Sequence, residues 1–329
     1  LVDGKWTADW QPVQAKDEKG GFVRQISSFR NWVTPDGGPG PTGTGGFAAE
    51  TGRYHLYVAL ICPWASRTLI ARRLKGLEDV ISVSVVEPAL TDQGWRFGDY
   101  PGADRDTLNG ATYMHELYTR ADPHFTGRAT VPVLWDRKTG TIVSNESADI
   151  VRMMNSGFGD LASGPDLYPQ DLRAEIDALN DWVYPRLNNG VYRAGFATTQ
   201  VAYDEAYHDV FAALDALEDR LSDGRSWLMG DRITETDILD GRWDNAAVEL
   251  WRVNWVDTSQ RLLLRRGAVG QIRRGRMAFV AEVRSLAHVL GQTVGRTFQA
   301  GCDAALGDAR CGIDLENAIY KGIGVVTDL

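Results

Sequence analysis

The chain has 329 residues, of which 43% are hydrophobic and 24% are charged, a composition typical of a globular protein long enough for two domains. Its formal net charge of −9 argues against nucleic acid as a main partner, because phosphate binding depends on dense lysine and arginine. No run approaches the ~20 apolar residues of a membrane span, and residues 1–10 lack a signal-peptide pattern, so we expect no membrane partner.

The cysteines and histidines argue against two kinds of site. The three cysteines, Cys62, Cys302 and Cys311, are too few for a disulfide scaffold, and we expect a reducing, cytoplasmic location. The five histidines are scattered, and no two stand at the helical spacing of metal ligands. The sequence therefore predicts no metal site.

The first half of the chain has the order β-α-β, a connection, then β-β-α. Residues 1–50 are polar and glycine-rich, and predict an extended N-terminal arm. The residues that follow predict a strand at 54–60, a helix at 63–74, strands at 80–86, 131–135 and 141–143, and a helix at 145–155. We expect residues 51–160 to form a thioredoxin-like α/β domain with a mixed sheet. The polar connection at about 88–128 is too long to be structureless without a functional reason.

The second half is helical in pattern. Glycines and prolines at 156–170 predict an interdomain linker. Apolar residues then keep helical spacing over 203–221, and Thr234 with Asp237 has the form of a capping box. We expect an all-α C-terminal domain over residues 170–329.

Cys62 stands where the first strand ends and a helix begins, because Pro63 suits the first position of a helix. The N-terminus of a helix offers unpaired N–H groups and a partial positive charge, which stabilise a thiolate and lower its pKa. A lone cysteine is more often an inert buried residue, but the order strand–Cys–Pro–X–X–helix favours catalysis. Ala65 occupies the position of a second cysteine, so a mixed disulfide on Cys62 needs an external thiol to release it.

Two other segments suit a peptide-like ligand that carries an amino-acid end. A cis bond between Val131 and Pro132 would turn the Val131 backbone toward Cys62, where a ligand could pair with it; the alternative is an ordinary edge-strand proline. Glu146 and Ser147 begin a second helix, where the hydroxyl can hold a carboxylate and Glu146 can pair with an ammonium group. The alternative is a solvated helix start.

Several motifs together resemble the glutathionyl-hydroquinone reductases, the Xi class of glutathione transferases, over residues 1 to about 237. The Cys-Pro-Trp-Ala motif at 62–65 and the Asn-Asn-Gly-Val-Tyr segment at 188–192 are highly specific in combination. The remaining matches are Phe22-Val23-Arg24, Phe29-Arg30, residues 52–57, 121–124, 130–136, 144–147 and 194–197.

The resemblance implies a glutathione transferase-like fold, a homodimer and a reaction that removes glutathione from S-glutathionyl-hydroquinones. It implies that Cys62 is catalytic, that Tyr192 lies over the aromatic substrate, and that glutathione contacts Trp95, Arg128, Val131, Glu146 and Ser147. The Cys62 thiolate would attack the glutathione sulfur, and a second glutathione would release oxidised glutathione. Two alternatives stay open, an Omega-like thiol transferase or dehydroascorbate reductase, and a non-catalytic glutathione-binding protein.

The resemblance stops after Asp237. Residues 238–315 do not match the family and carry an arginine-rich, lysine-poor run. Two explanations stay open, a sequence error such as compensating frameshifts, or a genuine divergent C-terminus. Cys302 and Cys311 fall in this region and receive no predicted role.

Overall fold

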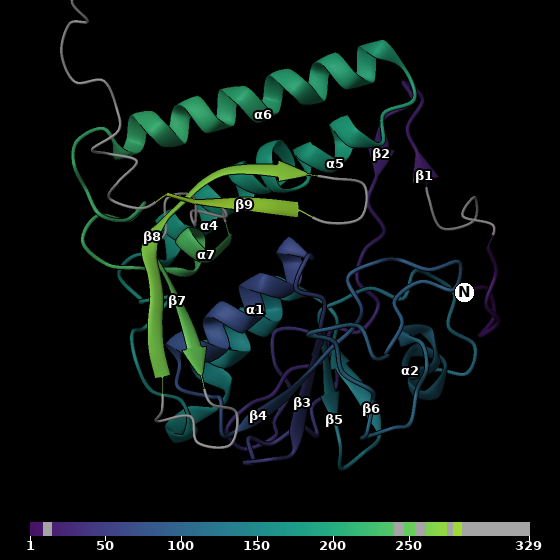
Figure 1. Cartoon of the computed structure of the whole chain (residues 1–329). Helices are drawn as coiled ribbons and strands as arrows, with labels where there is room; N and C mark the ends of the chain where they lie inside the picture. Colours follow the sequence, from purple (N-terminus) through teal and green to yellow (C-terminus); the bar gives the residue numbers. More distant parts are fainter. Residues whose placement is uncertain (9–14, 240–246, 254–260, 275–278, 285–329) are drawn as a thin grey trace, which may run out of the picture. The chain divides into compact units, whose positions relative to one another are not determined.

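The computed structural model describes residues 1–8, 15–239, 247–253, 261–274 and 279–284 (Figure 1). The predictions about Cys302 and Cys311 concern residues outside this set. Contacts divide the chain into two compact units, Leu1–Trp243 and Asp244–Leu329, and each unit is described by itself.

A four-stranded mixed sheet forms the centre of the α/β part of the first unit. Its strands are β3 (Tyr54–Val58), β4 (Ile81–Val85), β5 (Val133–Asp136) and β6 (Thr141–Ser144), in the spatial order β4-β3-β5-β6. β3 pairs with β4 in parallel and with β5 antiparallel, and β5 pairs with β6 antiparallel. All five residues of β3 are buried, which means that both faces of the sheet are covered at this strand. The predicted thioredoxin-like arrangement is confirmed.

Helix α1 (Pro63–Leu74) begins with the predicted proline, and α3 (Ser147–Arg152) packs beside it and runs into a π-helical turn, Met153–Gly157. Helix α2 (Met114–Ala121) lies in the long connection, where we predicted no helix. The Tyr113 N–H donates to the Glu116 carboxylate at 3.1 Å, and α2 buries Met114, Leu117 and Tyr118. Eight residues hold only two turns, too few for the periodicity to stand out in sequence.

The N-terminal arm is attached to the sheet. Its short strands β1 (Ala15–Lys16) and β2 (Phe22–Val23) pair antiparallel. Further along, the Asn31 N–H donates to the Val143 carbonyl at 2.9 Å, and the Asn145 N–H donates to the Phe29 carbonyl at 3.2 Å. These bonds hold the arm along β6, so the residues just before Phe29 reach the start of α3.

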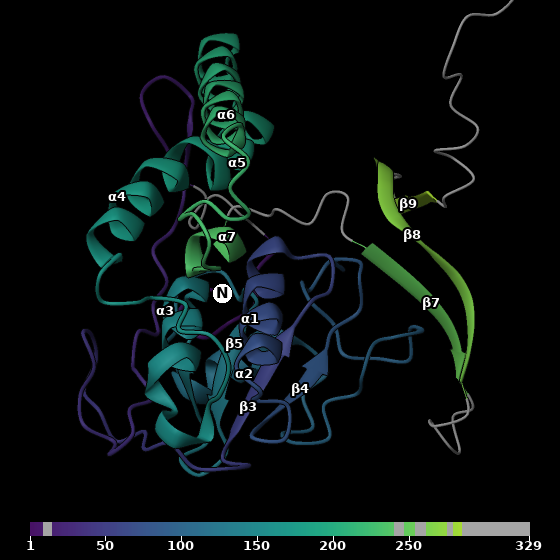
Figure 2. The ribbon, with the colours of Figure 1, turned by 90° about the vertical axis from the view of Figure 1, so that its left-hand side faces the viewer.

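The rest of the first unit is helical. Its elements are a 3-10 turn (Gly159–Leu161), α4 (Arg173–Val183), a π-helical turn (Tyr184–Asn188), α5 (Gly190–Gly195), α6 (Gln200–Leu221) and α7 (Glu235–Leu239). α5 and α6 lie side by side (Figure 1, Figure 2). α6 starts where the Thr199 hydroxyl accepts the Ala202 N–H at 3.2 Å, and it buries Val210, Ala213 and Leu217 in a second small core.

The described elements of the second unit are strands, which corrects our expectation of helices to residue 329. They are β7 (Ala247–Val253), β8 (Arg261–Arg274) and β9 (Phe279–Arg284), in one antiparallel sheet of order β7-β8-β9. The helical prediction here extended the second domain beyond Asp237, where the helical pattern had already ended. Among the described residues, no helix has both the length and the apolar character needed to span a bilayer.

Candidate active site

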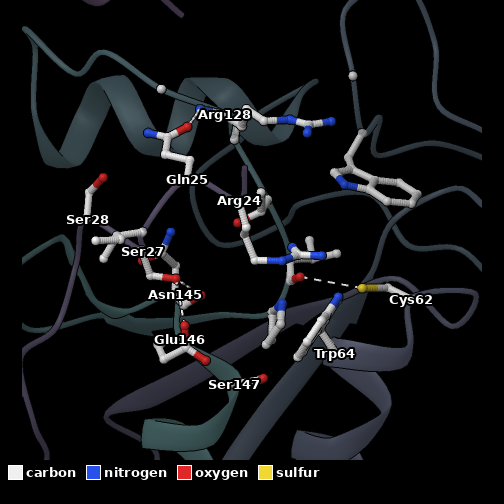
Figure 3. A pocket seen from close by; sticks show the side chains of 18 of the residues that line it. Arg24, Gln25, Ser27, Ser28, Cys62, Trp64, Arg128, Asn145, Glu146 and Ser147 are labelled. Atoms are coloured by element: carbon white, nitrogen blue, oxygen red, sulfur yellow. Dashed lines mark hydrogen bonds between the residues drawn. The ribbon is translucent and has the colours of Figure 1, made fainter. Parts of the chain in front are cut away.

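One pocket of about 830 Å³ in the first unit is lined by all seven residues that the sequence singled out (Figure 3). Its wall combines the N-terminal arm, the start of α1, the segment before β5, the start of α3 and helix α5. The seven residues are Cys62, Trp95, Arg128, Val131, Glu146, Ser147 and Tyr192. A volume of this size is in the usual range for sites that bury a small organic ligand.

Cys62 is the residue that caps α1, and two opposing effects act on its thiol. The sulfur lies 3.5 Å from the Val131 carbonyl oxygen. Burial raises the pKa of the Cys62 thiol above its ordinary value, against the N–H groups of Ala65 and Trp64 and the nearby cations Arg24 and Arg67. We expected a lowered pKa from the helix N-terminus alone. That expectation was wrong, because loss of solvation outweighs the helix and the cations.

The Val131–Pro132 peptide bond is cis, as predicted. A hydrogen-bond network fixes the residue before it, because the Tyr118 hydroxyl donates to the Thr130 carbonyl at 2.9 Å. The Asn145 amide in turn donates to the Tyr118 hydroxyl at 3.1 Å. The missed helix α2 therefore ties the Val131 segment to the start of α3.

Glu146 caps α3 with its side chain. One carboxylate oxygen accepts the Ala148 N–H at 3.2 Å, and the other accepts the Ser27 hydroxyl at 2.9 Å. Ser147 is buried, with its hydroxyl 3.5 Å from an Arg67 nitrogen. A carboxylate next to a hydroxyl and a cation can hold the ammonium and carboxylate groups of an amino acid together.

Arg128 and Trp95 stand on the other side of the pocket. The Arg128 N–H donates to the Gln25 side chain at 3.2 Å (Figure 3). Burial lowers the pKa of Arg128, and the charge of Arg24 lowers it further. The Trp95 carbonyl accepts the Met114 N–H at 2.9 Å, so the start of α2 fixes its backbone.

An aromatic wall adjoins Cys62. The Trp64 indole N–H donates to the Tyr192 hydroxyl at 2.8 Å, and Tyr192 stacks with Phe196 at 6.3 Å between ring centroids. Burial raises the pKa of the Tyr192 hydroxyl, and the charge of a Cys62 thiolate raises it further. The hydroxyl therefore stays protonated at neutral pH. Because it accepts from Trp64, its own proton is available for a ligand oxygen.

The sequence did not assign a role to the pocket residues of the N-terminal arm. Arg24, Gln25 and Ser27 all line the pocket, and each contacts a residue from another part of the chain. Arg24 belongs to one of the motifs, but no spacing rule relates an extended arm to partners more than 100 residues away. Among the described residues, no group of three or more histidine, cysteine or carboxylate side chains could hold a metal ion.

Comparison with protein families gives two matches in different parts of the chain. Residues 61–156 match the family described as "Glutathione S-transferase, N-terminal domain". Residues 216–314 match "Baseplate hub protein, N-terminal attachment domain". The second match includes most of the segment after Asp237, where the resemblance to the glutathionyl-hydroquinone reductases stops.

Similar proteins of known sequence or structure match about three quarters of the chain. The chain is 57% identical over 240 residues to "Glutathionyl-hydroquinone reductase YqjG" of Escherichia coli K12, covering 72% of each chain. It is 49% identical over 241 residues to "Glutathionyl-hydroquinone reductase PcpF" of Sphingobium chlorophenolicum, again covering 72% of each. The glutathione-bound structure of YqjG superposes with a TM-score of 0.65 at 53% identity, over 74% of this chain and 72% of that one. A Xi-class glutathione transferase from Natrialba magadii gives 0.66 at 47% identity, over 75% and 74%.

Proposed function

The chain belongs to the glutathionyl-hydroquinone reductases, the Xi class of glutathione transferases, and from this membership we propose how its pocket carries out the reaction. The protein is a glutathione-dependent oxidoreductase that converts S-glutathionyl-hydroquinones into hydroquinones. The observation that carries the proposed mechanism is the position of the Cys62 sulfur, 3.5 Å from the Val131 carbonyl and beside the hydrogen-bonded pair Trp64 and Tyr192.

In the proposed mode of binding, glutathione lies along the segment from Arg128 to Ser147. The ammonium group of its γ-glutamyl residue pairs with Glu146, and the neighbouring carboxylate accepts from the Ser147 hydroxyl. Its backbone pairs with Val131, while Arg128 and Trp95 contact the remainder. Polar groups at both ends would then direct the sulfur of glutathione toward Cys62.

The proposed chemistry has two steps. In the first, the conjugate is in its keto tautomer, and the Cys62 thiolate attacks the glutathione sulfur. The sulfur–carbon bond breaks, and the electron pair of that bond passes into the ring. The product is the hydroquinone anion, which is then protonated. In the second, the thiolate of another glutathione attacks the mixed disulfide, releases oxidised glutathione and restores the Cys62 thiolate. The second glutathione is necessary because Ala65 offers no resolving thiol.

The test is turnover of a glutathionyl-hydroquinone by the wild type and by Cys62→Ser. We expect the serine variant to lose more than tenfold in activity, a difference above ~1.4 kcal/mol, with an unchanged circular dichroism spectrum. Cys302→Ser, at a cysteine with no predicted role, is the matched control. Turnover of a glutathione mixed disulfide without turnover of the hydroquinone conjugate would instead support the Omega-like alternative. Glutathione binding without turnover of either would support the non-catalytic one.

The domain boundaries, the homodimer and the cytoplasmic location are further parts of this proposal. We place the glutathione-binding domain at residues 51–160 and the start of the substrate domain at residue 170. The family's fold supports the boundaries, and the need for free glutathione as a reductant supports a reducing compartment. Sedimentation of the purified chain would test the homodimer.

A further inference from the structure

Arg24 reaches the pocket from the N-terminal arm, just after β2. Its guanidinium carbon lies 4.3 Å from the centroid of the Tyr192 ring and 4.8 Å from that of Trp64. The Nε–H donates to the Asn189 side-chain oxygen at 2.6 Å. Figure 3 shows Arg24 between Arg128 and the pair formed by Trp64 and Cys62. Three contacts with fixed side chains thus hold its guanidinium group against the aromatic wall.

The charge of Arg24 has no counter-ion within the described part of the chain. Arginine is always protonated and carries five N–H donors. Its Nη2 atom is buried and has no hydrogen-bond partner. Two carboxylates line the pocket, and both already have partners. Glu146 accepts from Ser27 and from the Ala148 N–H, and Asp149 is paired with Arg30. A buried N–H without an acceptor is costly, and a ligand oxygen would remove that cost.

The surroundings of Arg24 limit what that ligand oxygen can be. The flat rings of Tyr192, Trp64 and Phe196 favour an aromatic ligand, and Arg128 adds a second cation to the same pocket. A negatively charged oxygen on an aromatic ring satisfies both features. Arg24 is close enough to Cys62 for its charge to act on the thiol, so such a ring would stand beside the reacting sulfur.

We propose that Arg24 is a catalytic residue that binds the ring oxygen of the hydroquinone as that oxygen becomes a phenolate. This inference rests on the proposed function. When the Cys62 thiolate attacks the glutathione sulfur, the sulfur–carbon bond breaks and its electron pair moves through the ring to the keto oxygen. The ring is reduced to the hydroquinone anion, and the two sulfurs become a disulfide. An Arg24 N–H placed at that oxygen stabilises the charge as it forms.

A kinetic comparison of two substrates tests the role. The first is a glutathionyl-hydroquinone, and the second is the mixed disulfide of glutathione and 2-mercaptoethanol, whose leaving group has no ring oxygen. Rates are compared at the alkaline plateau, where Cys62 is a thiolate in both proteins. We expect Arg24→Met to lower kcat/KM about 100-fold on the first substrate and less than about threefold on the second. Equal losses on both substrates, or no loss on either, would overturn the proposal.

The matched control is Arg186→Met. Arg186 also stacks on a tryptophan, with its guanidinium carbon 5.1 Å from the Trp182 ring centroid, but it does not line the pocket. We expect this variant to keep the activity of the wild type on both substrates. A loss as large as that of Arg24→Met would mean that the effect comes from a general loss of stacking, and the proposal would fail.

A binding experiment tests the role of Arg24 separately from the proposed function. If the wild type does not turn over the conjugate, that result refutes the proposed function and leaves the binding experiment valid. The probe is 4-nitrophenol, whose yellow phenolate form is measured by absorbance. We expect bound 4-nitrophenol to titrate at lower pH in the wild type and in Arg186→Met than in free solution, and we expect Arg24→Met to remove this shift. No shift in the wild type, or equal shifts in the wild type and Arg24→Met, would overturn the role of Arg24.

Discussion

The proposed reactivity of Cys62 depends on groups that act against the effect of its burial. The pocket raises the pKa of the thiol by excluding water, while two backbone N–H groups and two arginines favour the thiolate. A buried thiolate that these groups do stabilise is poorly solvated, and therefore a strong nucleophile once formed. Both Cys62 and Tyr192 have raised pKa values, so both groups are protonated at neutral pH.

Tyr192→Phe should impair turnover of the aromatic conjugate more than it impairs glutathione binding. The ring remains, but the hydroxyl that accepts from Trp64 and can donate to the substrate is lost. We expect kcat/KM to fall about 10- to 100-fold, or ~1.4–2.7 kcal/mol, and the glutathione Kd to change little. Tyr203→Phe, on the exposed side of α6, is the control. Equal losses in both quantities would make Tyr192 a structural residue.

Helix α1 starts just after Cys62, and its buried residues begin in the first turn at Ala65. Ala65 and Ala71 are both fully buried on α1. Ala65 lies about one helical turn from Cys62. Ala71 is nine positions from Cys62, which corresponds to about 13 Å along the helix axis.

Ala65→Cys should turn the single-thiol site toward a dithiol site. The new thiol can resolve the mixed disulfide on Cys62, so the dependence of the rate on a second glutathione should weaken and disulfide exchange should increase. The kinetic order in glutathione is the measurement. Ala71→Cys, equally buried but out of reach, should keep the wild-type order. An unchanged order in Ala65→Cys would contradict the alignment of Ala65 with a resolving cysteine.

Helix α7 is held by Asp237, which does more than the predicted capping box requires. One carboxylate oxygen accepts the Thr234 N–H at 2.9 Å and the Thr234 hydroxyl at 3.1 Å. The other accepts the Leu228 N–H at 2.8 Å, so the side chain also fixes the preceding loop. The sequence indicated the bond to Thr234, and only the tertiary structure adds the bond to Leu228.

Asp237→Ala should destabilise the first unit by about 3 kcal/mol, because it leaves three buried donors without an acceptor. The free energy of unfolding in urea, followed by tryptophan fluorescence, is the measurement. Asp231→Ala, at an exposed position in the same loop, should change it by less than about 0.5 kcal/mol. Similar values for the two variants would refute a special role for Asp237.

For the whole molecule, stability should depend on pH through His55, a buried residue of β3. Burial lowers the pKa of His55 to about 4, and the charge of Arg137 lowers it further. The Nδ1 atom lies 2.7 Å from the Ser82 hydroxyl, and the buried Nε2 has no partner. The unfolded chain, with a histidine pKa near ~6.5, binds this proton first as the pH falls.

The free energy of unfolding should therefore decrease as the pH falls from about 6.5 toward 4, by at most about 3 kcal/mol from this one group. Urea unfolding at pH 7 and at pH 4.5 measures the change. His55→Gln should weaken the pH dependence, whereas His208→Gln, at an exposed position, should keep it. The same pH dependence in the wild type and in His55→Gln would show that other groups are responsible.

Features that depend on neighbours along the chain could be predicted from the amino-acid sequence. Short stretches of sequence predict three such features. They are the strand before Cys62, the proline that starts α1, and the start of α3 at Glu146. Five of the seven predicted residues lie in these stretches or in the motifs that mark the family, whereas Trp95 and Arg128 were implied only by the resemblance. Helix α2 was missed because two turns are too short to show a helical period in the sequence. The strands after residue 246 were missed because we had extended the predicted helical domain to residue 329.

The way in which distant segments complete the pocket depends on the tertiary fold. Arg24, Gln25 and Ser27 come from the part of the arm after β2 that has no regular structure. Their partners Asn189, the Arg128 N–H and Glu146 are more than 100 residues away. No periodicity links such residues, because only the attachment of the arm along β6 brings them together. The direction of the Cys62 pKa shift has the same cause. A helix N-terminus is visible in sequence, but the burial that outweighs it depends on every segment of the wall.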